Sequence, residues 1–338
     1  MLTNILPIAL LFSSASASCL HGTSLMPRRL TKRAGEVEVS NFGYTALTGP
    51  LNWHNIEAGN ELCNTGSNQS PINLDDTVAL ATEAPAIDIA NVEAAEFENL
   101  GSTLETIVNG TTTVGGQAFN LAQFHLHTPS EHRIADEYFP LEMHMVHEAG
   151  DGSGKIVVVA VLFQLSEDGA TTTDLLTAAT QNIAEVEEPG TVTETGALDF
   201  AAVVEHLSST PLLNYTGSLT TPPCAEDVTF LVTQQPLPLD VATYNKVKGV
   251  IKFNARFTQN ALGQANLLDQ AALANLAAGA GEGVEQSLAA VSSDSSKVVA
   301  TNESVAAAAP PPETNAEQLY ALSSKLQEVD SAIHEIIG

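Results

Sequence analysis

Basic residues, cysteine and long apolar runs are all scarce in this chain. Only 12 of the 338 residues are lysine or arginine, against 40 that are acidic, so the formal net charge is -28. A surface this acidic repels nucleic acid and anionic membranes, and we expect neither as a partner. Beyond the first residues, no segment is long and apolar enough to cross a bilayer. Hydrophobic residues still make up 44% of the chain, which argues against global disorder.

The N-terminal residues predict export. An apolar stretch from Ile5 to Phe12 precedes a run of small residues, which is typical of a secretory signal peptide over residues 1–18, although a positively charged start is missing. A buried helix is the alternative. The dibasic pair Lys32–Arg33 resembles a processing site. We therefore expect a propeptide over residues 19–33 and a secreted, extracellular protein that begins at Ala34.

Three cysteines leave room for one disulfide. Cys19 lies in the expected propeptide and leaves with it. Cys63 and Cys224 remain, and in an oxidising compartment we expect them to form one disulfide that closes a very long loop. Two free buried thiols are the alternative.

Residues 34–270 predict a single, mostly β domain of the α+β class. Short apolar or alternating runs recur, separated by Gly, Pro, Asn and Asp, which is typical of a mainly antiparallel sheet. The runs cover 106–109, 119–127, 141–147, 156–165 and 228–233. Helical patterns interrupt them only around 173–184 and 200–207.

The composition changes after this domain. Ala, Gly, Ser and then Pro dominate residues 271–313, which predicts a linker. Thr314 and Glu317 match a helix-capping box, and apolar residues follow at alternating spacings of three and four, so 314–338 predicts a short amphipathic helix. A homo-oligomer formed through this helix is one expectation. A marginal helix that docks on the domain or frays in water is the alternative.

Three histidines in two short runs indicate a metal site. His125 and His127 are two residues apart in QFHLHTPSEH, so in a strand both side chains point to one face. In LEMHMVH, Glu142 and His144 share a face in the same way. If the two strands pair, three imidazoles converge, and three protein ligands with an open fourth position are typical of a catalytic zinc.

Residues close to these histidines have the chemistry that such a site needs. Gln123 and Glu142 each lie two residues before a ligand and are expected to orient it through its second ring nitrogen. A metal hydroxide also has to be aimed at its target. One of the two threonines in the sequence SLTTPP is expected to accept the proton of the hydroxide in a hydrogen bond and to donate its own to a carboxylate, which Glu131 supplies.

The motifs and their order resemble the α-class carbonic anhydrases. The matching segments span about residues 40 to 262 and read FGY, NWH, NQSPINL, QFHLHTPSEH, LEMHMVH, VVAVLFQ, GSLTTPPC and KFNARFTQ. The compact HTPSEH is similar to the plant, algal and microbial branches, and dibasic processing suits a secreted fungal member. The resemblance implies a large twisted, mainly antiparallel sheet with peripheral helices, and a zinc ion at the base of a cleft.

Carried over residue by residue, the resemblance implies a role for each matching position. His125, His127 and His144 become the zinc ligands, and Thr220 with Glu131 the catalytic orienting pair. The residues expected to bind carbon dioxide or line its cavity are Thr221, Val146, Val159, Leu219 and Phe230. The supporting residues are Gln123, Glu142, Asn254 (through its backbone carbonyl) and Tyr44 (through a solvent network). Cys63 and Cys224 match the disulfide of secreted members.

One departure from the family concerns proton transfer. Many fast members carry a shuttle histidine after Asn-Gly, whereas here Thr111 follows Asn109 and Gly110. We therefore expect a working enzyme whose turnover depends on buffer; a substitute shuttle at His54, near the rim of the cleft, is the alternative. Asn109, Asn214 and Asn302 begin glycosylation sequons.

These observations predict a secreted, glycosylated zinc enzyme that hydrates carbon dioxide reversibly to bicarbonate and a proton. The alternatives are a secreted zinc esterase and a non-catalytic binding protein on the same scaffold. The second alternative would require a missing ligand, and none is missing.

Overall fold

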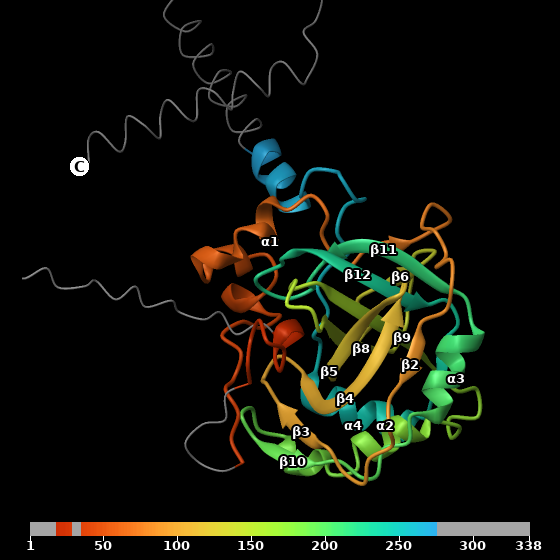
Figure 1. Cartoon of the computed structure of the whole chain (residues 1–338). Coiled ribbons are helices and arrows are strands. Elements are labelled where there is room, and N and C mark those ends of the chain that lie inside the picture. The colour runs from red at the N-terminus through yellow and green to blue at the C-terminus, as the bar shows by residue number, and fades with distance from the viewer. Residues whose placement is uncertain (1–17, 29–34, 276–338) are drawn as a thin grey trace, which may run out of the picture. The chain divides into compact units, whose positions relative to one another are not determined.

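A ten-stranded sheet forms the framework of the protein (Figure 1). The structure, a computed structural model, describes residues 18–28 and 35–275. Along the sheet the strands follow the order β10-β3-β4-β5-β8-β9-β12-β11, with β2 paired to β4 and β13 to β9. Its strands are β2 (Ala86–Asp88), β3 (Glu96–Asn99), β4 (Leu104–Val114), β5 (Gln117–His127), β8 (Leu141–Ala149), β9 (Ile156–Leu165), β10 (Val192–Glu194), β11 (Leu212–Ser218), β12 (Glu226–Thr233) and β13 (Leu237–Leu239).

Most neighbouring strands of this sheet are antiparallel, as the sequence predicts. In the described residues, β9 alone pairs in parallel within it, with β12 and with β13. A small second sheet joins β1 (Asn73–Leu74), β6 (Arg133–Ile134) and β7 (Glu137–Tyr138). The predicted fold class, mostly β on one large twisted sheet, is confirmed.

Helices cover one face of the large sheet. α2 (Asp174–Ala179), α3 (Ala201–Ser209) and α4 (Val241–Ile251) place Leu176, Val203 and Val247 in the same apolar cluster as Met143 and Met145 of β8. The opposite face of β8 carries the histidine side chain. The sheet is therefore buried on both sides, with the candidate site on the side away from these helices.

Short helical segments complete the described chain. They are α1 (Leu62–Thr65) and the 3-10 turns η1 (Ser18–Leu20), η2 (Ala46–Thr48), η3 (Trp53–Asn55), η4 (Ala58–Asn60) and η5 (Ile183–Val186). The predicted helices over 173–184 and 200–207 correspond to α2 with η5 and to α3. Helix α4 was not predicted; its N-cap is Asp240, whose carboxylate accepts a hydrogen bond from the backbone amide of Thr243.

Several predicted segments fall outside the described residues. These are most of the signal peptide, the dibasic pair, most of the linker, the C-terminal helix and Asn302. Residues 267–275 are helical, so the predicted domain boundary at 270 lies too early, inside a helix. Within 18–28 and 35–275, no helix has the length and apolar character needed to cross a membrane.

Candidate metal centre

Two adjacent strands bring the three predicted histidines together. β5 carries His125 and His127, and the ladder between β5 and β8 places His125 opposite His144. The ring centroids lie 5.1 Å apart for His125 and His127, 5.3 Å for His125 and His144, and 4.6 Å for His127 and His144. All three side chains are at most 1% exposed. The alternation of strand side chains and the pairing of β5 with β8 together build this cluster.

A different acceptor fixes each imidazole. Nδ1 of His125 lies 2.8 Å from Oε1 of Gln123, and Nδ1 of His127 lies 2.9 Å from the carbonyl oxygen of Asn254. In His144 the other nitrogen is used, because Nε2 lies 2.8 Å from Oε1 of Glu142. These contacts leave Nε2 of His125, Nε2 of His127 and Nδ1 of His144 for a metal ion.

The remaining nitrogens fit a divalent cation. One ligand atom from each histidine lies within 4.8 Å of the others. Nε2 of His127 is buried and has no hydrogen-bond partner among the described residues, which is costly unless an ion binds there. Burial lowers the pKa of all three histidines below the ordinary value, so the rings are neutral and able to coordinate.

Glu142 supports more than the one ligand that the sequence predicted. Its Oε1 accepts hydrogen bonds from Nε2 of His144 and from Nδ1 of His132, at 2.8 and 2.6 Å. Its Oε2 accepts from the backbone amides of Glu131 and His132, at 2.7 and 2.9 Å. Burial alone would raise the pKa of Glu142, but the two imidazoles outweigh it and hold that pKa well below its ordinary value. The carboxylate is therefore ionised and holds the strand and the loop together.

The second nitrogen of His132 continues this network away from the site. Nε2 of His132 lies 2.6 Å from the hydroxyl of Tyr215, which lies 2.9 Å from the hydroxyl of Ser70. His132 is therefore a buried hydrogen-bonded residue that orients Glu142 from behind. The partners Tyr215 and Ser70 were missed, because no local spacing links them to the histidine motif.

The predicted orienting pair also lies at the cluster. The Thr220 hydroxyl interacts with the Glu131 carboxylate, whose Oε2 lies 3.5 Å from Nε2 of His127. Burial raises the pKa of Glu131 to about 7. The backbone amide of Arg256 donates to Oε1 of Glu131 at 2.9 Å. The Arg256 side chain, 1% exposed, adds a buried positive charge that the sequence did not reveal.

Comparison with known proteins agrees with this geometry. A model of the family described as eukaryotic-type carbonic anhydrase matches residues 48–267. The chain belongs to the carbonic anhydrase family. It is thus an enzyme of the lyase class, and the family reaction is the hydration of carbon dioxide.

Bacterial and fungal carbonic anhydrases are among its relatives. A carbonic anhydrase of Pectobacterium atrosepticum is 33% identical over 216 residues, which cover 62% of this chain and 83% of the relative. The fungal α-carbonic anhydrase from Aspergillus oryzae, whose structure is solved, is 44% identical in sequence, with a TM-score of 0.66. The match covers 68% of this chain and 98% of the A. oryzae chain. The α-carbonic anhydrase of Thermovibrio ammonificans, solved in complex with the inhibitor sulfanilamide, is 30% identical, with a TM-score of 0.58. The match covers 67% of this chain and 97% of the T. ammonificans chain.

One residue expected on the substrate wall of this carbonic anhydrase points elsewhere. Val146, Leu219 and Phe230 share one apolar cluster on the histidine side of the sheet. Val159 lies with Met145 in the cluster on the other side, so its prediction is corrected. The adjacent Val158, which pairs with Val146, occupies the wall position. Thr221 is fully buried next to Thr220.

Thr111 does not stand where a proton shuttle would. In β4, Glu105 pairs with His125, whereas Thr111 pairs with Asn120. Thr111 is six positions further along the strand than Glu105, about 20 Å along the sheet. The prediction that Thr111 replaces the shuttle histidine of a carbonic anhydrase is therefore wrong in its placement.

The other predicted residues lie as follows. Tyr44 packs against Trp53, and burial together with the nearby Glu131 raises its pKa, which places Tyr44 close to the orienting pair. His54 lies in the turn η3. Cys63 and Cys224 form the predicted disulfide. Asn109 and Asn214, on β4 and β11, are exposed.

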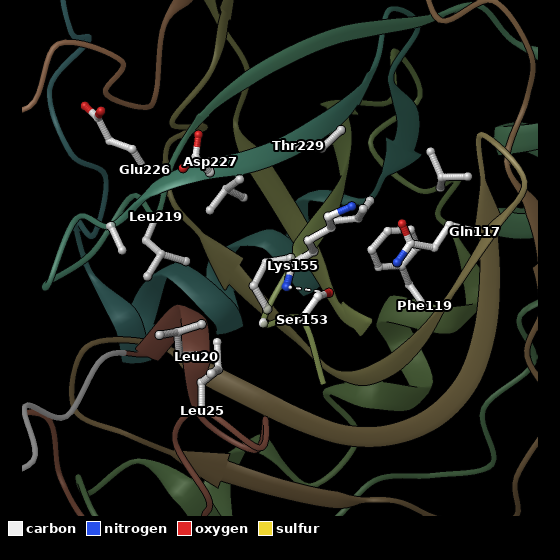
Figure 2. A pocket seen from close by; sticks show the side chains of 16 residues that line it. Leu20, Leu25, Gln117, Phe119, Ser153, Lys155, Leu219, Glu226, Asp227 and Thr229 are labelled. Carbon is white, nitrogen blue, oxygen red and sulfur yellow. Dashed lines mark hydrogen bonds between the residues drawn. The ribbon is translucent and has the colours of Figure 1, made fainter. Parts of the chain in front are cut away.

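Cys19 lies at the centre of the site, which the sequence did not suggest. Its Sγ is 3.9 Å from Nε2 of His125 and 3.5 Å from the hydroxyl of Thr220, and the side chain is 2% exposed. Leu20 and Leu25 line a cavity of about 710 Å³, together with Leu219 and others (Figure 2).

Proposed function

We propose that this chain is a secreted zinc enzyme that converts carbon dioxide and water reversibly into bicarbonate and a proton. Its zinc ligands are Nε2 of His125, Nε2 of His127 and Nδ1 of His144. The observation that carries the proposal is the fixing of the opposite nitrogen of each ring by Gln123, Asn254 or Glu142, which aims the remaining nitrogens at one point. Three neutral imidazoles leave the positive charge of the ion uncompensated.

When bound, zinc supplies a hydroxide nucleophile near neutral pH by lowering the pKa of a coordinated water, an effect for which carbonic anhydrase is the usual example. Thr220 orients this nucleophile. Its hydroxyl interacts with the Glu131 carboxylate, and in the proposed arrangement it donates there, so that its oxygen is left to accept a hydrogen bond and to fix the direction of attack. The backbone amide of Arg256 holds Glu131 in position from the other side.

An apolar wall holds carbon dioxide beside the histidines. Phe230 lies with its ring centroid 5.9 Å from that of His144, and Val146 is two residues along β8 on the same face. Leu219 and Val158 complete the wall, and Thr221 adds a hydroxyl next to Thr220. Carbon dioxide has no net charge or dipole, so an apolar wall beside the reacting centre suits it better than it suits bicarbonate.

The proton released by each turnover leaves through solvent. Among residues 18–28 and 35–275, the histidines outside the ligand set are His21, His54, His132, His147 and His206. Two of these, His132 and His147, have both ring nitrogens hydrogen-bonded inside the protein. We retain the prediction of a buffer-dependent enzyme, and His54 stays the candidate for a substitute shuttle.

The test is zinc content together with stopped-flow hydration of carbon dioxide. The loaded enzyme is expected to bind one zinc per chain and to be active, and removal of the metal by a chelator abolishes activity. His144→Ala is expected to lose the metal, whereas the matched control His206→Ala, on α3, keeps both metal and activity. Zinc-loaded protein without hydration activity would contradict the proposal.

The same assays distinguish the alternatives. Ester hydrolysis without carbon dioxide hydration would indicate a zinc esterase, and absence of both would indicate a binding protein. The fourth coordination position also predicts inhibition by sulfonamides, the class to which the sulfanilamide bound in the T. ammonificans structure belongs.

A further inference from the structure

Residues 18–28 form a segment, here called the strap, that lies across the histidine cluster. We propose that the strap inhibits the enzyme before processing, with the Cys19 sulfur as the fourth ligand of the metal ion and the strap in place of carbon dioxide. The inference rests on the proposed metal centre. It adds a regulatory state in which that centre is closed.

Positively charged or protonatable side chains of the strap pair with buried carboxylates of the sheet. Glu98 and Glu105 face each other directly across β3 and β4, and both are fully buried. Like charges in this arrangement destabilise a sheet. Nδ1 of His21 lies 2.5 Å from Oε1 of Glu105, and Arg28 forms ion pairs with Glu96 and Glu98. Among residues 18–28 and 35–275, the strap therefore supplies the positive groups that pair with these two carboxylates.

Further contacts fix the strap between these anchors. The backbone amide of Ser24 donates to Oε2 of Glu148 at 2.8 Å, and its hydroxyl donates to Oε1. Within the strap, the Thr23 hydroxyl donates to the carbonyl oxygen of Leu20 at 2.7 Å. Gly22 adopts a φ of +80°, which favours glycine. The strap is thus a defined turn docked on the sheet.

Cys19 occupies the position where the reaction would take place. It belongs to the apolar cluster that contains Val146, Leu219 and Phe230, which is the proposed carbon dioxide wall. Its backbone amide donates to the hydroxyl of Thr221 at 3.3 Å, and its sulfur lies next to the hydroxyl of Thr220. The strap therefore blocks both the wall and the two threonines.

The distance from the Cys19 sulfur to the nearest of the three free ligand nitrogens is close to that expected across a shared zinc ion. A tetrahedral zinc with bonds of about 2.3 Å to sulfur and about 2.0 Å to nitrogen keeps those ligand atoms roughly 3.5 Å apart. The observed separation between Sγ of Cys19 and Nε2 of His125 is 3.9 Å, and the buried Nε2 of His127 lacks a hydrogen-bond partner among the described residues. On coordination the thiol loses its proton to solvent, and the water that would otherwise complete the coordination leaves. No oxidant or reductant is needed.

Processing explains how the strap is released. The dibasic pair Lys32–Arg33 follows the strap in the sequence. Before cleavage the strap is tethered and acts at a millimolar effective concentration. After cleavage it becomes a separate peptide that is diluted away, and the fourth position opens. The expected rise in activity on cleavage and dilution is on the order of tenfold or more.

The experiment uses the full chain with Lys32→Gln and Arg33→Gln, which keeps the strap attached, and cobalt in place of zinc. We expect a thiolate-to-cobalt charge-transfer band in the near ultraviolet, and its loss in the same chain with Cys19→Ser. The visible bands of a tetrahedral cobalt site serve as the control for folding and metal binding, and they are expected in both proteins. Visible bands in both without the charge-transfer band would overturn the inference while leaving the metal centre intact. Absence of visible bands in both would refute the metal centre itself.

Thiol reactivity gives a second, independent readout. Cys19 is the only free thiol, because Cys63 and Cys224 are joined. We expect iodoacetamide to label Cys19 slowly in the uncleaved, metal-loaded chain and faster once Arg28→Gln removes one anchor. Two results together would overturn the inference. One is an equal labelling rate of Cys19 with and without Arg28→Gln, and the other is equal hydration activity of the cleaved and uncleaved chains.

Discussion

Replacing Glu142 by glutamine tests how the metal ligands are oriented. The carboxylate accepts four hydrogen bonds, two at each oxygen. In Glu142→Gln, one carboxylate oxygen is replaced by an NH₂ group, which donates hydrogen bonds and cannot accept them. The two buried donors at that position then have no acceptor. Either the two imidazoles, His132 and His144, or the two backbone amides lose their acceptor.

The magnitude follows from these contacts. Each buried donor left without an acceptor costs about 1–3 kcal/mol, so the free energy of unfolding is expected to fall by about 2–6 kcal/mol. Loss of a residue that orients a metal-bound histidine typically lowers metal affinity by about 10- to 100-fold. Both effects are expected here, because the same carboxylate supports His144 and the loop that carries His132.

Two measurements separate the effects. Urea unfolding of the metal-free proteins gives the change in stability, and competition with a chromophoric chelator gives the zinc affinity. Glu194→Gln on β10 is the matched control, because that side chain is exposed and distant from the site. If Glu142→Gln binds zinc as tightly as the wild type and unfolds within about 0.5 kcal/mol of it, the orienting role is refuted.

Three further predictions concern pH, the disulfide and proton transfer. Burial lowers the pKa of His147 from 6.5 to about 4, so the unfolded chain takes up this proton first. The stabilising contribution of neutral His147 is complete above pH 6.5, and about 3 kcal/mol of the free energy of unfolding is lost as the pH falls to 4. Urea unfolding measures this loss, and an equal loss of stability between pH 6.5 and 4 in His147→Gln would contradict the prediction. The Cys63–Cys224 bond joins residues 161 apart, so replacing both with alanine is expected to lower the free energy of unfolding by about 2–5 kcal/mol in the same assay. An unchanged urea midpoint would contradict this prediction. Added imidazole is expected to raise turnover at low buffer, whereas Thr111→His is not, because Thr111 lies far along β4; equal gains from both would show that the distance argument is wrong.

The ligand set was predictable because it depends largely on local alternation. Residues two apart on a strand share a face, so His125 with His127 and Glu142 with His144 could be placed locally, and only the pairing of the two strands had to be assumed. The support of His127 by the Asn254 carbonyl is different. The two residues are 127 positions apart, and the resemblance to a family supplied that contact where local spacing could not.

The register of β9 shows where sequence patterns fail. Ile156 to Phe163 are all buried, because this strand is covered on both faces. A continuous apolar run has no alternation from which to tell the two faces apart, so nothing in the run could check the assignment of Val159 that the family resemblance implied. Thr111 was misplaced for a related reason: a short Asn-Gly match does not fix the position of a residue along a strand.

The contact between the strap and the histidine cluster was not predicted, because the sequence analysis assigned these residues to a propeptide that is cleaved off. A propeptide is expected to leave, so Cys19 was counted out of the site. Its partners, Glu98 and Glu105, lie far along the chain and have no motif that links them to His21. Only the folded chain shows that these residues meet.

The most direct test of the account is anomalous diffraction at the zinc absorption edge from crystals of the zinc-loaded chain. The account predicts one peak about 2.0 Å from Nε2 of His125, Nε2 of His127 and Nδ1 of His144. Crystals of fully loaded protein in which the peak lies elsewhere, with these three rings pointing apart, would contradict it.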